Sequence, residues 1–200
     1  MAGHYLEALD CYRKGLAIAL RNFGEYSRIT AKIYYEMGVV YSSLENYSEA
    51  ARCYLKSLKI RKKILGESHA FTASTCMALS EAFSHLGDCE NATAFVEEAL
   101  RMYMKAFPQK SEELIEAFQR ASFVYRECGF YDNALEKMEK SLELARKIYG
   151  EESAAVAYAC GEILSPVPCF CEEGIWRGEL DNGGFLRKAG CDLRRNGGLP

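Results

Sequence analysis

Apolar residues recur along this chain at intervals of three and four positions, the spacing that places them on one face of an α-helix. One such face runs from Ile33 to Leu44, and a second runs from Ala50 to Ile64. Asn46 lies in the polar turn between them. Asparagine is favoured at a helix start because its side chain accepts a hydrogen bond from a free backbone amide. The pattern therefore predicts two helices joined by a short turn.

The second of these helices closes with residues that typically end a helix. Its last turns contain the basic segment from Lys59 to Lys63, and Gly66 follows shortly afterwards. Cations interact favourably with the exposed carbonyl groups at a helix C-terminus, and glycine adopts the backbone conformation in which the chain leaves the helix. We therefore expect the helix to end near Gly66, where the chain turns into the next helix.

The helix pair recurs with a period of 42 residues and without insertions. One register of the repeat holds four alanines, Ala8, Ala50, Ala92 and Ala134. Another register holds four leucines, Leu16, Leu58, Leu100 and Leu142. A small residue allows paired helices to approach closely, and a larger side chain would overpack their crossing. Periods of this length predict a solenoid of stacked helix pairs.

The repeat register also predicts how the chain is organised. We expect an all-α fold, with an α-solenoid of antiparallel helix pairs over residues 3–164 and a Gly/Pro-rich, disordered tail over residues 165–200. The repeat helices are expected at about 3–22, 26–64, 68–106, 111–148 and 152–164. The tail contains three of the four prolines and seven of the sixteen glycines, a composition that favours disorder. Because the register opens on the second helix of a pair, we expect a window cut from a longer array.

The repeat also keeps the spacing of a known signature. Tyr34, Gly38 and Tyr41 occupy the aromatic, glycine and tyrosine positions of the tetratricopeptide pattern W-x2-L-G-x2-Y. Ala50 and Tyr54 occupy those of its A-x3-F element. The chain thus resembles tetratricopeptide repeat proteins, and its longer period is similar to that of kinesin light chain repeats. The resemblance implies stacked helix pairs with a concave groove lined mostly by the first helix of each pair.

Composition and charge narrow the function classes. The 200 residues include 25 basic and 28 acidic side chains, for a formal charge of -3. A dedicated nucleic-acid binder would instead show a basic stripe and a high pI, and no segment has the ~18 consecutive apolar residues of a membrane-spanning helix. The nine cysteines are an odd number, and several lie inside helical patterns, so we expect free thiols in a cytoplasmic protein. The resemblance adds association with the cytoskeleton or a cilium as an alternative location.

No pattern points to catalysis, and we expect a protein that is not an enzyme and needs no cofactor or metal. The one local constellation, His85 with Asp88 and Cys89, contains a nucleophile, a base and an orienting group. It aligns with the turn between two helices in the preceding repeat, so we interpret it as a turn. Zinc ligation by four cysteines of the C-terminal part is disfavoured because their spacing lacks paired C-x2-4-C ligands; they are Cys160, Cys169, Cys171 and Cys191.

The sequence therefore predicts binding of a protein or peptide partner. As a repeat protein, it is expected to recognise a peptide or helix in its extended concave surface. The family register implies these groove residues: Lys32, Tyr35, Val39, Ser42, Ser74, Met77, Glu81, Ser84, Glu116, Gln119, Phe123 and Arg126. An alternative function is structural, in which the protein self-associates or joins a larger cytoskeletal or ciliary complex through uncapped repeat ends.

Overall fold

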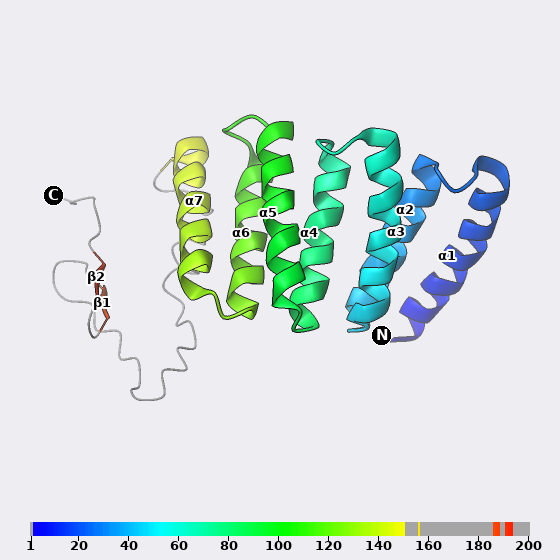
Figure 1. Ribbon diagram of the computed structural model, residues 1–200, viewed down its shortest axis with the longest axis horizontal. Helices are drawn as coiled ribbons and strands as arrows, with labels where there is room; N and C mark the ends of the chain where they lie inside the picture. The colour runs from blue at the N-terminus through cyan, green and yellow to red at the C-terminus, as the bar shows by residue number, and fades with distance from the viewer. Residues whose placement is uncertain (1, 151–155, 157–185, 189–190, 194–200) are drawn as a thin grey trace. The chain divides into compact units, whose positions relative to one another are not determined.

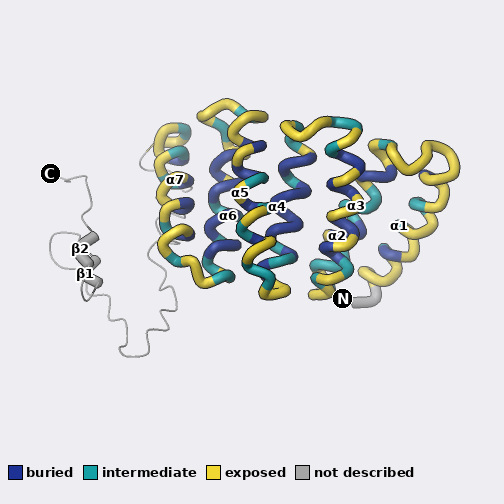
Figure 2. Tube along the Cα trace, in the orientation of Figure 1, coloured by how far each residue is buried: buried dark blue, intermediate teal, exposed yellow. Residues whose placement is uncertain are grey.

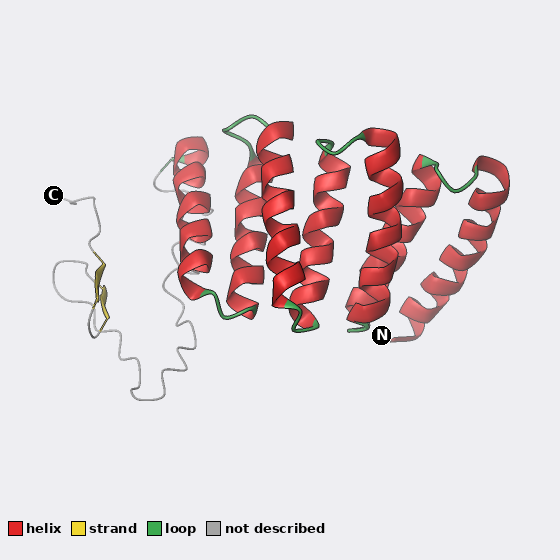
Figure 3. Cartoon of the chain, in the orientation of Figure 1, coloured by secondary structure: helices red, strands yellow, loops and turns green. Residues whose placement is uncertain are grey.

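The computed structural model describes residues 2–150, Val156, 186–188 and 191–193. The chain divides into two units, Met1–Leu164 and Ser165–Pro200. In the described part of the first unit, the chain forms helices joined by short loops (Figure 3). They are α1 (Ala2–Phe23), α2 (Arg28–Ser43), α3 (Tyr47–Leu65), α4 (Ala70–His85), α5 (Cys89–Ala106), α6 (Glu112–Glu127) and α7 (Tyr131–Tyr149). The all-α repeat fold is confirmed.

The helices pack as consecutive pairs. The most extensive contacts join α2 with α3, α4 with α5, and α6 with α7, and each pair also packs on its neighbours along the chain (Figure 1). In addition, α4 packs directly on α6, whereas no comparable contact joins α3 with α5 or α5 with α7. Helices α4 and α6 therefore approach each other more closely than α3 and α5 or α5 and α7 do, as expected for neighbours on the inner side of a curved solenoid.

The helices begin at capping side chains and end at glycines, at positions that the sequence predicts. The side chain of Asn46 accepts a hydrogen bond from the backbone amide of Glu49 at the start of α3, at 3.3 Å. Asp88 caps α5 in the same way. Gly66 follows α3 with a φ of +87°, a left-handed conformation that glycine adopts without steric cost. The predicted turns at Asn46 and Gly66 are confirmed.

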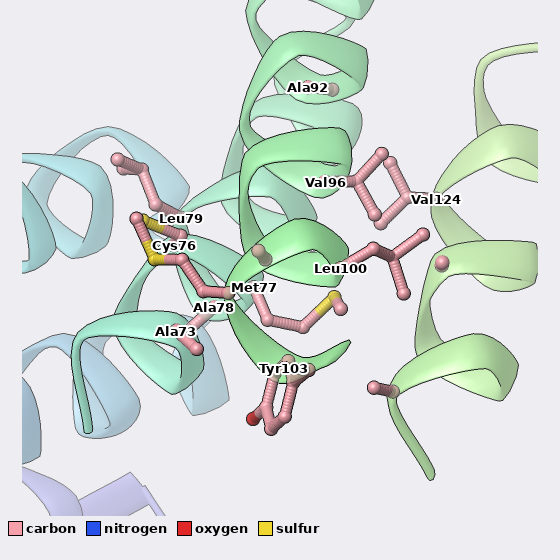
Figure 4. Close-up of a cluster of buried hydrophobic side chains, with 14 of the residues drawn as sticks. Ala73, Cys76, Met77, Ala78, Leu79, Ala92, Val96, Leu100, Tyr103 and Val124 are labelled. Atoms are coloured by element: carbon pink, nitrogen blue, oxygen red, sulfur yellow. The ribbon is translucent and has the colours of Figure 1, made fainter. Parts of the chain in front are cut away.

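Two small apolar clusters flank a main cluster that runs between the helix layers from α3 to α7. Its centre lies where α4, α5 and α6 meet, with Leu79, Val96 and Val124 fully buried (Figure 4). Ala50 and Ala92 are also fully buried, which fits the small side chain expected at the helix crossings. Buried residues follow the inward faces of the central helices, and exposed residues follow their outer faces and the loops (Figure 2).

One close approach within the first full repeat explains a glycine of the signature. A Cβ atom placed on Gly38 of α2 would lie 2.5 Å from the ring of Tyr54 in α3. That ring is itself 3% exposed, so it has little room to move away. Glycine at this position therefore allows α2 and α3 to pack with an aromatic ring between them.

The second unit is described only in part. Two short strands, β1 (Leu186–Lys188) and β2 (Cys191–Leu193), pair antiparallel, with Arg187 opposite Asp192. This pair of strands was not predicted from the sequence. The rest of the segment predicted to be disordered, and the helix expected over 152–164 apart from Val156, lie outside the described residues. Among the helices that the structure describes, none combines the length and apolar character that a membrane crossing requires.

Candidate binding groove on the even-numbered helices

A pocket of about 370 Å³ opens on the surface formed by α2, α4 and α6. Four of the predicted groove residues line it, and α3 contributes two tyrosines to its wall. The lining residues are Tyr35, Val39, Ser42, Ser43, Tyr47, Tyr54, Ala78, Glu81, Ala82, His85 and Arg120. Because these side chains come from one helix pair, α2 with α3, and from the first helix of each of the next two pairs, the pocket exists only when the repeats stack.

Aromatic rings form much of the pocket wall. Tyr47 stacks on His85, with ring centroids 4.2 Å apart and planes inclined by 18°. His85 in turn lies 5.7 Å from the ring of Phe123, so three helices contribute to one row of rings. A second pair, Tyr35 and Tyr54, has centroids 5.5 Å apart. Rings in these arrangements offer large, rigid apolar surfaces with polar edges, which suit the recognition of a peptide.

An ion pair between Glu81 of α4 and Arg120 of α6 forms part of the pocket wall. The guanidinium of Arg120 donates to both carboxylate oxygens of Glu81, at 2.6 and 3.1 Å, and about three quarters of each side chain is buried. Burial disfavours the charged form of Arg120, but the hydrogen bonds and attraction from Glu81 outweigh it, so its pKa is raised. Arg120 therefore stays protonated, and its guanidinium has further N–H groups that can donate hydrogen bonds.

A buried arginine supports the same wall from behind. Arg61 of α3 is 7% exposed, and its guanidinium lies 4.6 Å from the centre of the Tyr35 ring. It donates to the backbone oxygen of Phe71 at 2.6 Å and to Thr75 Oγ1 at 2.7 Å. Burial lowers its pKa. These contacts hold the Tyr35 ring in place and join α2, α3 and α4.

Burial keeps the hydroxyl groups of Tyr35 and Tyr54 protonated over the physiological range. Burial raises the pKa of Tyr54 to about 12, and its hydroxyl lies 3.4 Å from Ser42 Oγ. Burial also raises the pKa of Tyr35. These hydroxyls can therefore both donate and accept hydrogen bonds to a ligand or to water.

The structure places the predicted groove residues in three groups. Tyr35, Val39, Ser42 and Glu81 line the pocket, and Phe123 contacts it through His85. Five others are at least partly exposed on the even-numbered helices outside the pocket, namely Lys32, Ser74, Glu116, Gln119 and Arg126. Two are buried. Whether any of them contacts a partner stays a prediction.

The two buried residues require a correction. Met77 is completely buried and belongs to the apolar core. Ser84 is 6% exposed, and its hydroxyl donates to the backbone oxygen of Glu81. Both positions follow from the repeat register. However, α4 packs against three other helices, so part of the face that is open in α2 is covered in α4. Neither side chain is accessible to a ligand in this structure.

Sequence reasoning also missed several residues of the pocket. Arg120, His85 and Tyr47 were not among the predicted groove positions, yet each lines it. The sequence held only a weak indication that these residues line the pocket. Arg120 is next to the predicted Gln119, and Tyr47 directly follows the cap of α3. Helix rotation decides which of two neighbouring residues faces the groove.

The alternative interpretations of His85, Asp88 and Cys89 are resolved in favour of a turn. α4 ends at His85, Asp88 accepts a hydrogen bond from the Asn91 amide at 3.2 Å, and α5 begins at Cys89. Within the described residues, no group of three or more His, Cys, Asp or Glu side chains is arranged to hold a metal ion. Three cysteines of the zinc alternative, Cys160, Cys169 and Cys171, lie outside those residues.

Comparisons with known proteins agree with this geometry. A family model described as tetratricopeptide repeat matches residues 1–63 and 30–105. The fold is similar to the nearly identical TPR-like repeats of a putative kinesin light chain from Podosopora anserina, with a TM-score of 0.71 and 17% identity over 80% of this chain and 76% of that one. A variant of the same repeats gives a TM-score of 0.72.

A second structural relative is BtubC from P. vanneervenii, with a TM-score of 0.66 and 21% identity over 72% of this chain. The match spans 58% of the BtubC chain, less than two thirds of its length. At these identities the likeness shows the fold. A search of curated proteins found no match.

Proposed function

The chain belongs to the tetratricopeptide repeat family, and from that premise we propose that it is a non-enzymatic adaptor or scaffold. It binds a peptide or helix of a partner protein in the groove of α2, α4 and α6. The observation that carries the proposal is the pocket of about 370 Å³ built by side chains from successive repeats. Repeats of this family generally mediate protein–protein interaction.

The chemistry of the pocket suits an extended segment with at least one apolar side chain. The stacked Tyr47 and His85 rings provide an apolar surface, while the Glu81–Arg120 pair offers both acceptors and donors. Polar groups that are already fixed by neighbours lose little freedom on binding, which favours affinity. Repeat proteins use the extended concave surface of the solenoid for binding.

Neighbouring tyrosines of α2 provide a matched test. Tyr35 lines the groove, whereas Tyr34 lines a different pocket, between α1, α2 and α3. We would select peptides from a displayed random library on the wild-type chain and then measure binding by fluorescence anisotropy. Tyr35→Ala with His85→Ala should weaken binding at least about tenfold, because central aromatic anchors dominate such interfaces. Tyr34→Ala should leave binding unchanged. Loss with Tyr34→Ala and retention with the double variant would reject the groove.

A second candidate function is favoured by the exposed apolar side chains of α1. Leu6 is 61% exposed, Ile18 60% and Phe23 57%. Large apolar side chains that are exposed on one molecule can be covered in an assembly, so we propose self-association or assembly into a larger cytoskeletal or ciliary complex as the alternative. Light scattering over a dilution series tests it. A mass that stays monomeric at high concentration argues against self-association, and a dimer that Leu6→Ser disrupts supports it.

A further inference from the structure

The outer face of α3 carries four exposed cations in one row. Arg52, Lys56, Lys59 and Lys63 are separated by four, three and four positions and are all exposed, so they share one face of the helix. At a rise of 1.5 Å per residue the row is about 16 Å long. We call these four residues the basic row.

The same positions on the other odd-numbered helices carry mixed charges. On α7 they are Glu136, Lys140, Glu143 and Lys147, which form two ion pairs within the helix. On α1 they include Asp10 and Lys14, which are paired at 2.6 Å, and on α5 they include Glu98, which pairs with Lys62 at 2.7 Å. Only α3, among these four helices, presents cations at all four positions.

Few acidic side chains among the described residues neutralise the positive charges of the basic row. Arg52 pairs with Glu49 at 2.9 Å. Lys56 lies over the ring of Tyr34 at 5.1 Å, and Lys63 lies over that of Tyr26 at 3.6 Å. None of the described carboxylates lies within ion-pair distance of Lys56, Lys59 or Lys63. Three like charges on successive turns repel one another, so an anionic partner would stabilise them.

A pocket lies beside the basic row. It has a volume of about 230 Å³ and lies between α1, α2 and α3, with Arg13, Arg52 and Lys56 against the single acidic residue Glu49. Arg13 donates to the hydroxyl of Tyr41 at 3.2 Å. Leu55 of α3 adds apolar surface close to the row and is 43% exposed. The row and this pocket together form a basic surface with apolar contacts.

We propose that this surface is a second binding site, separate from the groove, and that it takes an acidic segment of a partner protein. Carboxylates of an extended segment lie on one side about 7 Å apart, and those of a helix at every fourth residue lie about 6 Å apart. Either spacing matches the basic row, in which Arg52 and Lys56, and again Lys59 and Lys63, are four residues apart. Three or four carboxylates therefore fit along it.

The surroundings favour a protein segment over a nucleic acid. The chain carries a net charge of -3, and the equivalent positions of α1, α5 and α7 each include at least one acidic residue, so the row of four cations is confined to α3 among these helices. Nucleic-acid sites usually combine a wide basic area with free aromatic faces for stacking. Here the rings of Tyr26 and Tyr34 already have lysine ammonium groups over them.

The test uses fluorescent octaglutamate as the probe and the full chain as the receptor, with binding measured by anisotropy. Lys59→Glu with Lys63→Glu should raise the Kd at least about tenfold, because attraction becomes repulsion at two contacts. Arg101→Glu with Lys105→Glu is the matched control: it changes the net charge equally at the same register positions of α5, and should alter the Kd less than about twofold. Circular dichroism checks that both variants keep their helices.

Further binding measurements test whether the basic surface is a separate site for an acidic protein segment. Raising the salt from 50 to 300 mM should weaken wild-type binding severalfold, because the contacts are exposed charges. Tyr35→Ala should leave octaglutamate binding unchanged, which keeps this site distinct from the groove. Equal weakening by the two charge-reversal pairs would overturn the proposal. Tighter binding of a single-stranded DNA oligonucleotide or of phosphatidylserine vesicles, abolished by Lys59→Glu with Lys63→Glu, would overturn it in favour of that partner class.

Discussion

A comparison of α4 with α1 shows how strongly the burial of a repeat helix depends on its neighbours. α4 packs against α3, α5 and α6, and ten of its sixteen residues are buried. α1 is longer, but among the described helices it packs extensively only on α2. Of its side chains that the structure describes, Leu9 and Ala19 are buried. Both helices follow the repeat pattern, so the difference arises from position in the stack.

The comparison also separates two kinds of charge. α4 contains one acidic residue, Glu81, and it is partly buried in a bidentate pair with Arg120. α1 presents Asp10 and Lys14 in an exposed pair within the helix. The first pair joins two repeats across the groove, whereas the second affects one helix alone. Stability and recognition are therefore expected to depend most on the central helices.

The largest expected difference concerns two leucines. Leu79→Ala in α4 removes a side chain that is 0% exposed, and should lower the free energy of unfolding by about 2–5 kcal/mol because a cavity remains. Leu6→Ala in α1, where the side chain is 61% exposed, should cost less than about 1 kcal/mol. Urea unfolding followed by circular dichroism measures both. Equal losses would show that α1 is packed as tightly as α4 in solution.

Two glycines should respond with opposite signs. Gly38→Ala brings a methyl group against the buried Tyr54 ring and should destabilise by about 1–3 kcal/mol through overpacking. Gly15→Ala in α1 meets only Ile33 Cδ1, at 3.9 Å. It should stabilise by up to about 1 kcal/mol, because alanine has the higher helix propensity. Thermal melts of the two variants test the contrast. A rise in Tm for Gly38→Ala would contradict the close approach of α2 and α3.

The two ion pairs should differ by a smaller amount. Arg120→Met leaves the Glu81 carboxylate partly buried without its partner, and should cost about 1–2 kcal/mol, less than a fully buried pair would. Lys14→Met in α1 removes a pair whose side chains are 73% and 59% exposed, and it should lower the free energy of unfolding much less than Arg120→Met does, because solvent screens an exposed pair. Unfolding at 50 and 500 mM salt adds a check, since the exposed pair is screened more strongly. A larger loss for Lys14→Met would be inconsistent with the difference in burial.

The smallest effect concerns two thiols and alkaline pH. Burial raises the pKa of Cys76 to about 12, so below the ordinary thiol pKa its contribution to stability is complete. As the pH rises above that value, the unfolded thiol ionises while the folded one stays protonated, and stability falls. Between pH 7.5 and 9 the loss should be about 1 kcal/mol or less.

Thermal melts of two cysteine variants measure this pH dependence. Cys76→Ala should flatten the fall of Tm with pH, and Cys11→Ala, at an exposed position of α1, serves as the control. In the native protein Cys11 should react quickly with a thiol reagent while Cys76 stays protected. Fast labelling of Cys76 without denaturant would show that α4 opens readily.

The fold followed from the sequence because its determinants are local and repeat. The cap at Asn46, the terminating Gly66 and the buried Ala50 and Ala92 were all predicted from residue type and spacing, and the structure confirms each. The β1–β2 pair was not predicted. It contains six residues in a segment rich in glycine and proline, where no hydrophobic period is long enough to indicate a strand.

The candidate groove followed only in part. The register placed Tyr35 and Glu81 on the surface that carries the pocket, but it also selected Met77, which the core of α4 buries. Arg120 and Tyr47 were not predicted as groove residues. A repeat register assigns a helix face only to within about one residue, and neighbouring positions differ by about 100° around the helix. Small rotations of each helix therefore change which side chains are exposed.

The sequence by itself determined the period, the helix ends and the small residues at the crossings, because these depend on backbone chemistry and spacing along one chain. It also contained the basic row of α3, since four positions on one helix face can be read from their numbers. Only the tertiary structure decided which side chains meet between repeats. Glu81 and Arg120, and the Tyr47 and His85 rings, come together across separate helices. Their contact depends on the rotation and offset of the stacked pairs, which packing of the whole array sets.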